Sequence, residues 1–570
     1  MADGEAALRQ RRSRAEGLAS ASAELLLAAA LSVLPLVWRA VVGAGRFPAG
    51  DAWAYERIFD TFHRTGDIVL VGWNDLTLVG VLPVTEWWVS LVGYGDYQLY
   101  LLGAFMGFVA LLGLRDLVGS LGVRRRLLPI AVVGTYTGFV GIAGTYLADT
   151  FYFAGALWSV ALAMRILTAP RLTRRTEVIL AVVGALCAAY AFSVRQHAAA
   201  TAVAVTFVLW TARRGRSVAW WCYASCFLAL ALPLYIWRRG LANGGSEMLV
   251  FAPRSSIAAL YGALVTFALV PLPFLFGQPR RWLRTLPAAP YWCLVLIGLV
   301  AAPFSPTRPL LTEPSLVGEL IEEGGTVKWV LAFGLLLTTP WSLRLACQAL
   351  WSGLARPWDG RSKLTNLSLL LLLTGGLVVA SSVVTAAYYT RYTLVSAALL
   401  VALLQVANEL GADVRDHSSI AARPTTGRTA WLSVVGVLMA AFFAYWELDR
   451  SASSVPALTD AAAVAHCAGI PPEQIDGGFV WDGMHSTGVV DSSRQHVAPE
   501  DGLPPTENQS VFVEMNRRAV VLASPPEDLS GLAVFGPFHS GGILPGSRTE
   551  LWLITRTEDA GAVAECAPSG

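Results

Sequence analysis

Thirteen mostly apolar stretches dominate this chain, and each is near the ~20 residues that an α-helix needs to cross the hydrocarbon core of a bilayer. They cover residues 21–43, 98–120, 127–146, 150–168, 176–194, 197–212, 218–237, 256–277, 286–304, 327–347, 365–388, 392–408 and 430–447. Only 14% of the 570 residues are charged, whereas a soluble domain carries about a quarter. The sequence therefore predicts an all-α polytopic membrane bundle of about 13 transmembrane helices.

Basic residues alternate between the two sides of this predicted bundle. With the amino terminus in the cytoplasm, the cytoplasmic segments hold 22 Arg and Lys residues and the outer loops hold 10, as the preference of basic residues for cytoplasmic loops requires. This assigns 1–20 to a basic cytoplasmic tail, 21–447 to the transmembrane domain with a long first outer loop at 44–97, and 448–570 to an extracytoplasmic C-terminal domain. Arginine-rich, lysine-poor usage is typical of a high-GC bacterium, so we expect a multi-pass protein of the bacterial plasma membrane.

Short apolar runs separated by Pro and Gly turns predict a small α/β fold for the C-terminal domain. Strands are expected at Val511–Val513, Ala519–Ala523, Leu532–Phe535 and Leu551–Ile554, and a helix at Leu458–Ala468. The region also contains Cys467 and Cys566, the two cysteines outside the apolar segments. Outside the cytoplasm they form one disulfide or remain two unpaired thiols, and the sequence leaves both readings open.

Composition excludes several classes of function. The net charge of +2 gives no basic surplus for binding nucleic acid. The chain has two lysines, Lys328 and Lys363, and neither follows a glycine, so a phosphate-binding loop for ATP-driven transport is not expected. Cys-x-x-Cys and His-x-x-x-His patterns do not occur in the sequence, so a dedicated zinc site has no support.

Two acids lie at the predicted outer face of the bundle. Asp51 comes directly after the first span, and Asp149 lies in the short turn between the third and fourth spans. A charge near lipid is costly unless it is paired or used. Each acid also has a plain interpretation as the N-cap of the helix that follows. Two acids at the outer mouth of one bundle indicate a site more strongly than either acid alone.

Basic candidates lie on the same side. Arg195 and Arg391 occupy outer loops of only a few residues, against the positive-inside trend. The guanidinium fork matches phosphate oxygens, although an arginine here can also reach lipid head groups. His197 either donates to the same phosphate or caps a helix. We take Arg195, Arg391, His197 and Tyr392 as candidate phosphate-binding residues.

The first outer loop is rich in tryptophan, which favours the membrane interface. It contains Trp53, Trp73, Trp87 and Trp88. Its stretches Tyr55–Thr65 and Thr85–Val92 are typical of helices that lie on a membrane. They either roof a cavity between the spans or form an interfacial loop without a role in a site.

At these residues the chain resembles the GT-C superfamily of integral membrane glycosyltransferases, close to the protein-mannosyltransferase-like family 39 and the lipid A aminoarabinose transferases. The resemblance rests on Gly50-Asp51-Ala52-Trp53-Ala54-Tyr55, Leu147-Ala148-Asp149-Thr150-Phe151-Tyr152, Val194-Arg195-Gln196 and Thr390-Arg391-Tyr392. Each motif is short, but their order and common outer location extend the resemblance over residues 20–410.

The resemblance implies a GT-C-like fold and a polyprenyl-phosphate sugar as donor, with transfer to an extracytoplasmic polysaccharide, lipid or protein. It makes Asp51 the catalytic base that removes the proton from the acceptor hydroxyl. Asp149 would orient the acceptor or a metal, and Arg195 and Arg391 would hold the lipid phosphate. One direct displacement implies inversion at the anomeric carbon.

The chain departs from the family at one position in the first loop. Many relatives carry two adjacent acids there, but Ala52 follows Asp51, which weakens a version of the mechanism that uses a divalent metal. The C-terminal domain resembles the extracytoplasmic domains of some actinobacterial members. Its stretch 476–482 folds over the mouth of the site or binds a polysaccharide through Trp481, unless Trp481 is a core residue.

Three rival functions stay open. A transporter or flippase of lipid-linked sugars usually shows internal repeats, which the sequence lacks. A polysaccharide polymerase or ligase would keep its catalytic groups in a large later loop, and the outer stretch 305–326 carries Glu313, Glu319, Glu322 and Glu323. The C-terminal domain would also suit a sensor or scaffold without catalysis.

Overall fold

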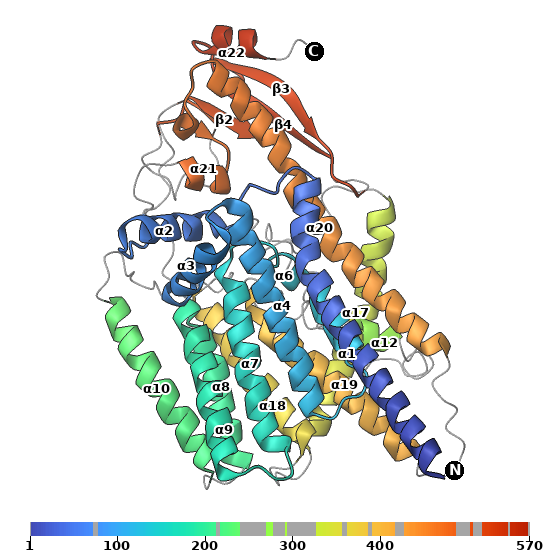
Figure 1. The fold of residues 1–570 in the computed structure, drawn as a ribbon. Helices are drawn as coiled ribbons and strands as arrows, with labels where there is room; N and C mark the ends of the chain where they lie inside the picture. Colours follow the sequence, from blue (N-terminus) through green and yellow to red (C-terminus); the bar gives the residue numbers. More distant parts are fainter. Residues whose placement is uncertain are drawn as a thin grey trace.

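A computed structural model gives the arrangement of the chain. It describes residues 2–71, 78–212, 217–239, 270–276, 291–292, 326–355, 362–385, 390–416, 427–485, 502–504, 516–544 and 548–567. A helical bundle forms one part, and a small domain with a sheet stands on one end of it (Figure 1). The predicted fold class, an all-α membrane bundle with a small α/β C-terminal domain, is confirmed.

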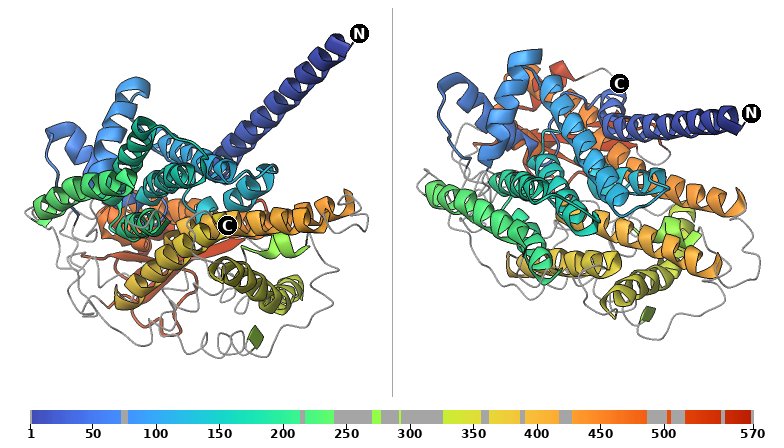
Figure 2. Two further views of the ribbon diagram at one scale, coloured as in Figure 1. Left: turned by 90° about the horizontal axis from the view of Figure 1, so that it is seen from below. Right: turned by 60° about the horizontal axis from the view of Figure 1, so that its bottom comes forward.

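Within the described ranges, eight helices are long and apolar enough to cross a membrane. They are α1 (Ala2–Val41), α4 (Asp96–Ser120), α7 (Ala148–Thr168), α8 (Arg174–Val194), α10 (Val218–Arg239), α18 (Lys363–Thr385), α19 (Leu394–Asp416) and α20 (Gly427–Cys467). The shorter α9 (Ala198–Ala212) and α12 (Leu272–Phe276) lie among them, together with α17 (Thr326–Leu354). The predicted spans at 256–277 and 286–304 lie mostly outside the described residues. In the views of Figure 2 the first part of α1 extends away from the bundle.

One predicted span takes a different form. Instead of a continuous helix over 127–146, the chain makes α5 (Leu127–Gly134) and α6 (Thr137–Val140), followed by turns. The break begins where the Thr135 hydroxyl turns back to the carbonyl of Ala131, and it ends at Gly144, whose φ of 75° is left-handed. Such a φ suits glycine and interrupts a helix.

The two predicted helices of the first outer loop are present as α2 (Ala52–Thr65) and α3 (Val81–Val92), with a short 3₁₀ turn η1 (Leu78–Gly80) before α3. They lie across one end of the bundle, beneath the C-terminal domain (Figure 1). The apolar face of α2 is buried, including Tyr55 and Phe59. Thr85 of α3 meets the hydroxyl of Tyr146 at 2.7 Å. These contacts make the loop a packed roof over the helix ends.

The C-terminal domain is built on a four-stranded sheet of order β1-β2-β4-β3. Its strands are β1 (Ile475–Asp476), β2 (Ala519–Leu522), β3 (Leu532–Ser540) and β4 (Thr549–Arg556). The β1–β2 pair is parallel, and the other two pairs are antiparallel. The domain also contains η4 (Pro472–Gln474), α21 (Phe479–His485) and α22 (Ala560–Cys566). The last three predicted strands are therefore present as β2, β3 and β4, whereas 511–513 lies outside the described residues.

The helix predicted at 458–468 is not separate from the last membrane helix. It is the end of α20, which runs unbroken from Gly427 to Cys467. Asp449 fixes this helix to its neighbours because it accepts bonds from Trp38 Nε1 of α1 at 2.7 Å and from the backbone N–H of Leu544 at 2.8 Å. The membrane bundle and the C-terminal domain thus share one helix.

Two sequence alternatives in the domain are resolved by packing. Cys467 and Cys566 are joined by a disulfide, which ties the end of α20 to α22. Trp481 is 7% exposed and packs in the core of the domain with Leu458, Ile475 and Leu553. Because its ring is buried, Trp481 is better explained as a core residue than as a polysaccharide-binding residue.

Candidate active site at the outer helix ends

Four charged side chains from distant parts of the chain meet at the end of the bundle beneath α2. Asp51 directly precedes α2, Asp149 lies in the first turn of α7, and Arg195 directly follows α8. Arg391 lies in the 3₁₀ turn η3 (Thr390–Thr393) that leads into α19. Each of the four residues lies at or next to the end of a helix or turn, and these ends meet beneath α2.

The four side chains form a continuous chain of ion pairs. An Nη2 of Arg391 donates to Asp51 Oδ2 at 2.8 Å, and its Nε lies 3.4 Å from Asp149 Oδ2. Arg195 Nη2 lies 2.6 Å from the same Asp149 oxygen and donates to the Tyr55 hydroxyl at 2.9 Å. Two carboxylates and two guanidinium groups therefore balance each other in charge.

Burial differs sharply among the four. The side chains of Asp149 and Arg195 are 0% and 2% exposed, whereas those of Arg391 and Asp51 are 7% and 14% exposed. Burial alone lowers the pKa of Arg195, but Asp149 and the neighbouring tyrosines raise it overall, so this guanidinium stays charged. A buried ion pair is stable only when its partners are both present and well placed. The buried pair of Asp149 and Arg195 is thus fixed in place, and Asp51 is the more solvent-exposed of the two acids.

His197 and Tyr392 line the site beside the arginines. Their rings stack with centroids 4.6 Å apart, and the Arg195 guanidinium carbon lies 5.6 Å from the Tyr392 ring. Burial and the charge of Arg195 lower the pKa of His197 to about 4. Both imidazole nitrogens are buried without a hydrogen-bond partner among the described residues. A neutral imidazole of this kind is available to a ligand.

The residues fit a divalent cation poorly. Both carboxylates already face guanidinium groups, and a hard cation prefers several oxygen ligands. Among the described ranges no three His, Cys, Asp or Glu side chains gather as a metal site. The geometry instead suits an anion that approaches the arginines.

Tyr55 is a site residue to which the sequence assigned no role. It accepts a bond from Arg195 and is buried, and burial raises the pKa of its hydroxyl well above its ordinary value. The spacing of Tyr55 could have predicted its place in the site. It follows Asp51 by four residues, and side chains four positions apart on a helix lie on the same face. The competing stretch 305–326, with its four glutamates, lies outside the described residues except for Thr326.

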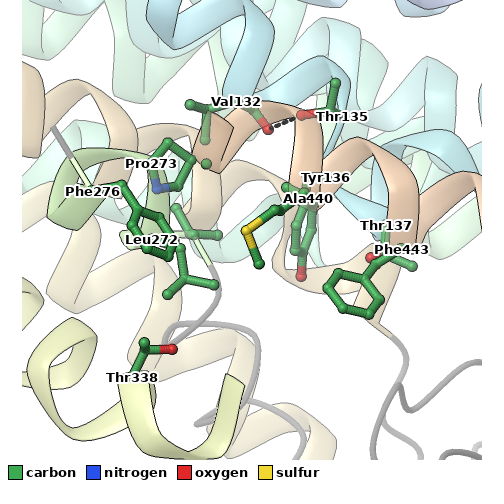
Figure 3. A pocket seen from close by; sticks show the side chains of 13 residues that line it. Val132, Thr135, Tyr136, Thr137, Leu272, Pro273, Phe276, Thr338, Ala440 and Phe443 are labelled. Atoms are coloured by element: carbon green, nitrogen blue, oxygen red, sulfur yellow. Dashed lines mark hydrogen bonds between the residues drawn. The ribbon is translucent and has the colours of Figure 1, made fainter. Parts of the chain in front are cut away.

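An apolar cavity of about 200 Å³ lies among the membrane helices. It lies between the α5–α6 segment, α12, α17 and α20, and Tyr136, Leu272, Ala440 and Phe443 point into it (Figure 3). The hydroxyl of Tyr136 lies 3.3 Å from Thr393 Oγ1, two residues after Arg391. One wall of the cavity is therefore linked through Tyr136 and Thr393 to the turn that carries Arg391.

Comparisons with known proteins give a structural likeness. No protein-family model and no curated protein sequence matches the chain. The oligosaccharyltransferase of Archaeoglobus fulgidus, solved with a tethered acceptor peptide, is similar with a TM-score of 0.51 at 14% identity, over 88% of this chain and 68% of that one. ArnT from Cupriavidus metallidurans, solved with undecaprenyl phosphate, has a TM-score of 0.43 at 13% identity, over 95% and 98% of the two chains. The chain therefore has the fold of this oligosaccharyltransferase, the GT-C-like membrane fold that the sequence predicts.

Proposed function

We propose that this protein is a membrane glycosyltransferase that moves a sugar from a polyprenyl-phosphate donor to an acceptor outside the cytoplasm. The observation that carries the proposal is the cluster of Asp51, Asp149, Arg195 and Arg391 at one end of the bundle. It offers a carboxylate that solvent reaches next to two guanidinium groups. A base beside a phosphate-binding pair is what glycosyl transfer from a lipid phosphate needs.

In the proposed reaction, Asp51 takes the proton from an acceptor hydroxyl as its oxygen bonds to the anomeric carbon. The bond from that carbon to the donor phosphate breaks, and polyprenyl phosphate leaves with the added negative charge. Arg391 stabilises that charge, and Asp51 is left protonated until it returns the proton to water. One displacement from the opposite face gives inversion.

Donor binding also prepares the base. Arg391 donates to Asp51 Oδ2, the oxygen that must accept the proton. A donor phosphate competes for the same guanidinium and releases Asp51. Asp149 is fully buried and bonded to Arg195, so its role is to keep both arginines in place.

The apolar cavity supports a lipid-linked donor. A cavity of about 150 Å³ holds one benzene, so a cavity of about 200 Å³ takes an isoprene unit or two next to the phosphate. Its wall is connected to η3 through Tyr136 and Thr393. The phosphate would lie on the arginines, with the first part of the tail directed toward α20 and the rest in lipid.

The test is transfer of radiolabelled sugar by the purified full-length protein from a panel of synthetic polyprenyl-phosphate sugars, in the presence or absence of candidate acceptors. Asp51→Asn should lower turnover by about 10²–10⁴, while donor binding persists. Asp67→Asn is the matched control, since Asp67 is exposed in the same outer loop. Equal turnover of Asp51→Asn and wild type would remove Asp51 as the base. Tight donor binding without any turnover would favour a transporter.

A further inference from the structure

The C-terminal domain contacts the chain on both sides of Asp51. Phe47, four residues before it, packs against the core cluster of the domain that includes Ile475 and Leu553. Trp53, two residues after it, lies against Gly483 of α21. The C-terminal domain therefore contacts the segment that carries the proposed base. In Figure 1, α21 of this domain lies next to α2.

The contact between Trp53 and Gly483 is unusually close. Trp53 is 2% exposed, and a Cβ built on Gly483 would lie 2.3 Å from Cδ2 and Cε2 of the indole. Carbon atoms in contact are normally about 3.5–4.0 Å apart. Gly483 lies inside α21 and has no positive φ, so backbone freedom does not call for glycine there. The close approach to Trp53 does.

A buried polar cluster holds α21 in place. Asp482, next to Gly483, is 2% exposed and its Oδ1 accepts from the backbone N–H of Gly477 at 3.0 Å. Asp476 of β1 accepts from Arg517 Nη1 at 3.1 Å. Since Asp476 and Asp482 lie together, this cluster joins α21 to the edge of the sheet.

We propose that the outer domain is a positioning element of the transfer site: Phe47 and Gly483 with Trp53 hold residues 47–53 so that Asp51 reaches Arg391 and the acceptor. The inference rests on the proposed function and adds to it that the domain is required for the chemical step. Trp53 and Gly483 act through Asp51 and are positioning residues. The arginines that would hold the donor lie on other segments, so loss of this contact removes no donor ligand and only frees Arg391 from its competitor Asp51.

The test uses Gly483→Ala in the full-length protein. We expect turnover to fall at least tenfold, with the donor KM not raised and the number of donor sites per protein unchanged by calorimetry. Gly561→Ala on α22 is the matched control, because its new methyl group meets nothing within 4 Å. Adding Trp53→Leu to Gly483→Ala makes room for the methyl group and should restore most of the turnover.

Hydrogen–deuterium exchange of peptides spanning 47–65 gives a readout that needs no activity. Gly483→Ala should raise exchange there, and Gly561→Ala should not. The inference is wrong if Gly483→Ala behaves like Gly561→Ala in exchange or turnover, or if the double variant is no better than the single one. A wild-type protein that turns over no donor would refute the proposed function, while raised exchange in Gly483→Ala would still establish the hold on residues 47–53.

Discussion

Asp51 and Arg391 stand 340 residues apart in the chain, and their side chains form an ion pair of 2.8 Å. The segment before α2 and the turn before α19 thus complete one site, and Arg391 extends it to Asp149 at 3.4 Å. Because the charges are balanced before any ligand binds, an incoming phosphate must redistribute them. This relationship makes each of the charged residues testable by a different variant.

Asp149→Asn should damage both folding and activity. It removes the charge that compensates Arg195, and leaving one partner of a buried ion pair costs about 3–5 kcal/mol. We expect a clearly lower melting temperature in detergent and loss of transfer. Asp116→Asn is the matched control, since its partner Arg165 is half exposed and such a pair contributes about 0–1 kcal/mol. Equal melting of the two variants would contradict the burial argument.

Arg391→Lys should keep the positive charge but lose the fork that contacts Asp51 and Asp149 together. An ammonium group offers one charged point, whereas guanidinium binds two acceptors in fixed geometry. Removing a preorganised donor typically lowers kcat by about 10²–10³. Steady-state kinetics over donor concentration checks this, with Arg64→Lys on the exposed side of α2 as the control. A donor KM and kcat like those of wild type would show that Arg391 does not contact the phosphate.

Ala440→Phe should fill the apolar cavity from the α20 side. We expect a higher KM for a long-chain donor, by roughly tenfold or 1.4 kcal/mol, and little change for a donor with a single isoprene unit. Leu438→Phe tests the surface of the same helix, because Leu438 is 61% exposed. The same change in KM for both donors would place the tail elsewhere.

Asp482 should make the stability of the C-terminal domain depend on pH. Burial, followed by the charge of Asp476, raises the pKa of Asp482 to about 9, whereas an unfolded Asp has a pKa of about 3.9. The folded state therefore keeps a proton that the unfolded state loses, so the free energy of unfolding falls as pH rises between these values, by at most about 1.4 kcal/mol per pH unit.

Asp482→Asn mimics the protonated acid and keeps an oxygen for the Gly477 N–H. Its melting temperature should change less from pH 5 to pH 8 than that of wild type, and calorimetry across this range measures the difference. Asp460→Asn, on the exposed side of α20, is the control. Parallel pH curves for Asp482→Asn and wild type would mean that Asp482 is ionised in the folded protein.

Cys566→Ser should lower the stability of the C-terminal domain, because it removes the disulfide with Cys467. The crosslink spans 99 residues, and closing a loop of this length contributes about 4.7 kcal/mol on the chain-entropy model. We expect faster proteolysis of residues after 467 and an unchanged membrane bundle, measured by limited digestion. Cys187→Ser is the control, since Cys187 is a free thiol.

The charged part of the site can be predicted from the sequence because charges directly beside the ends of apolar spans stand out. Asp51, Asp149, Arg195 and Arg391 each do so. The broken segment at 127–146 cannot be predicted, since its composition is as apolar as that of a full span and local turns decide its shape. Gly483 carries no signal either, because only the tertiary approach of Trp53 gives it a role.

The length of α20 has a consequence for how this protein can vary. At 1.5 Å per residue its 41 residues measure about 60 Å, roughly twice the ~30 Å of a bilayer core. The length of α20 therefore sets the distance of α21 from the membrane bundle. An inserted turn in α20 would lift the domain by about 5.4 Å and part Gly483 from Trp53.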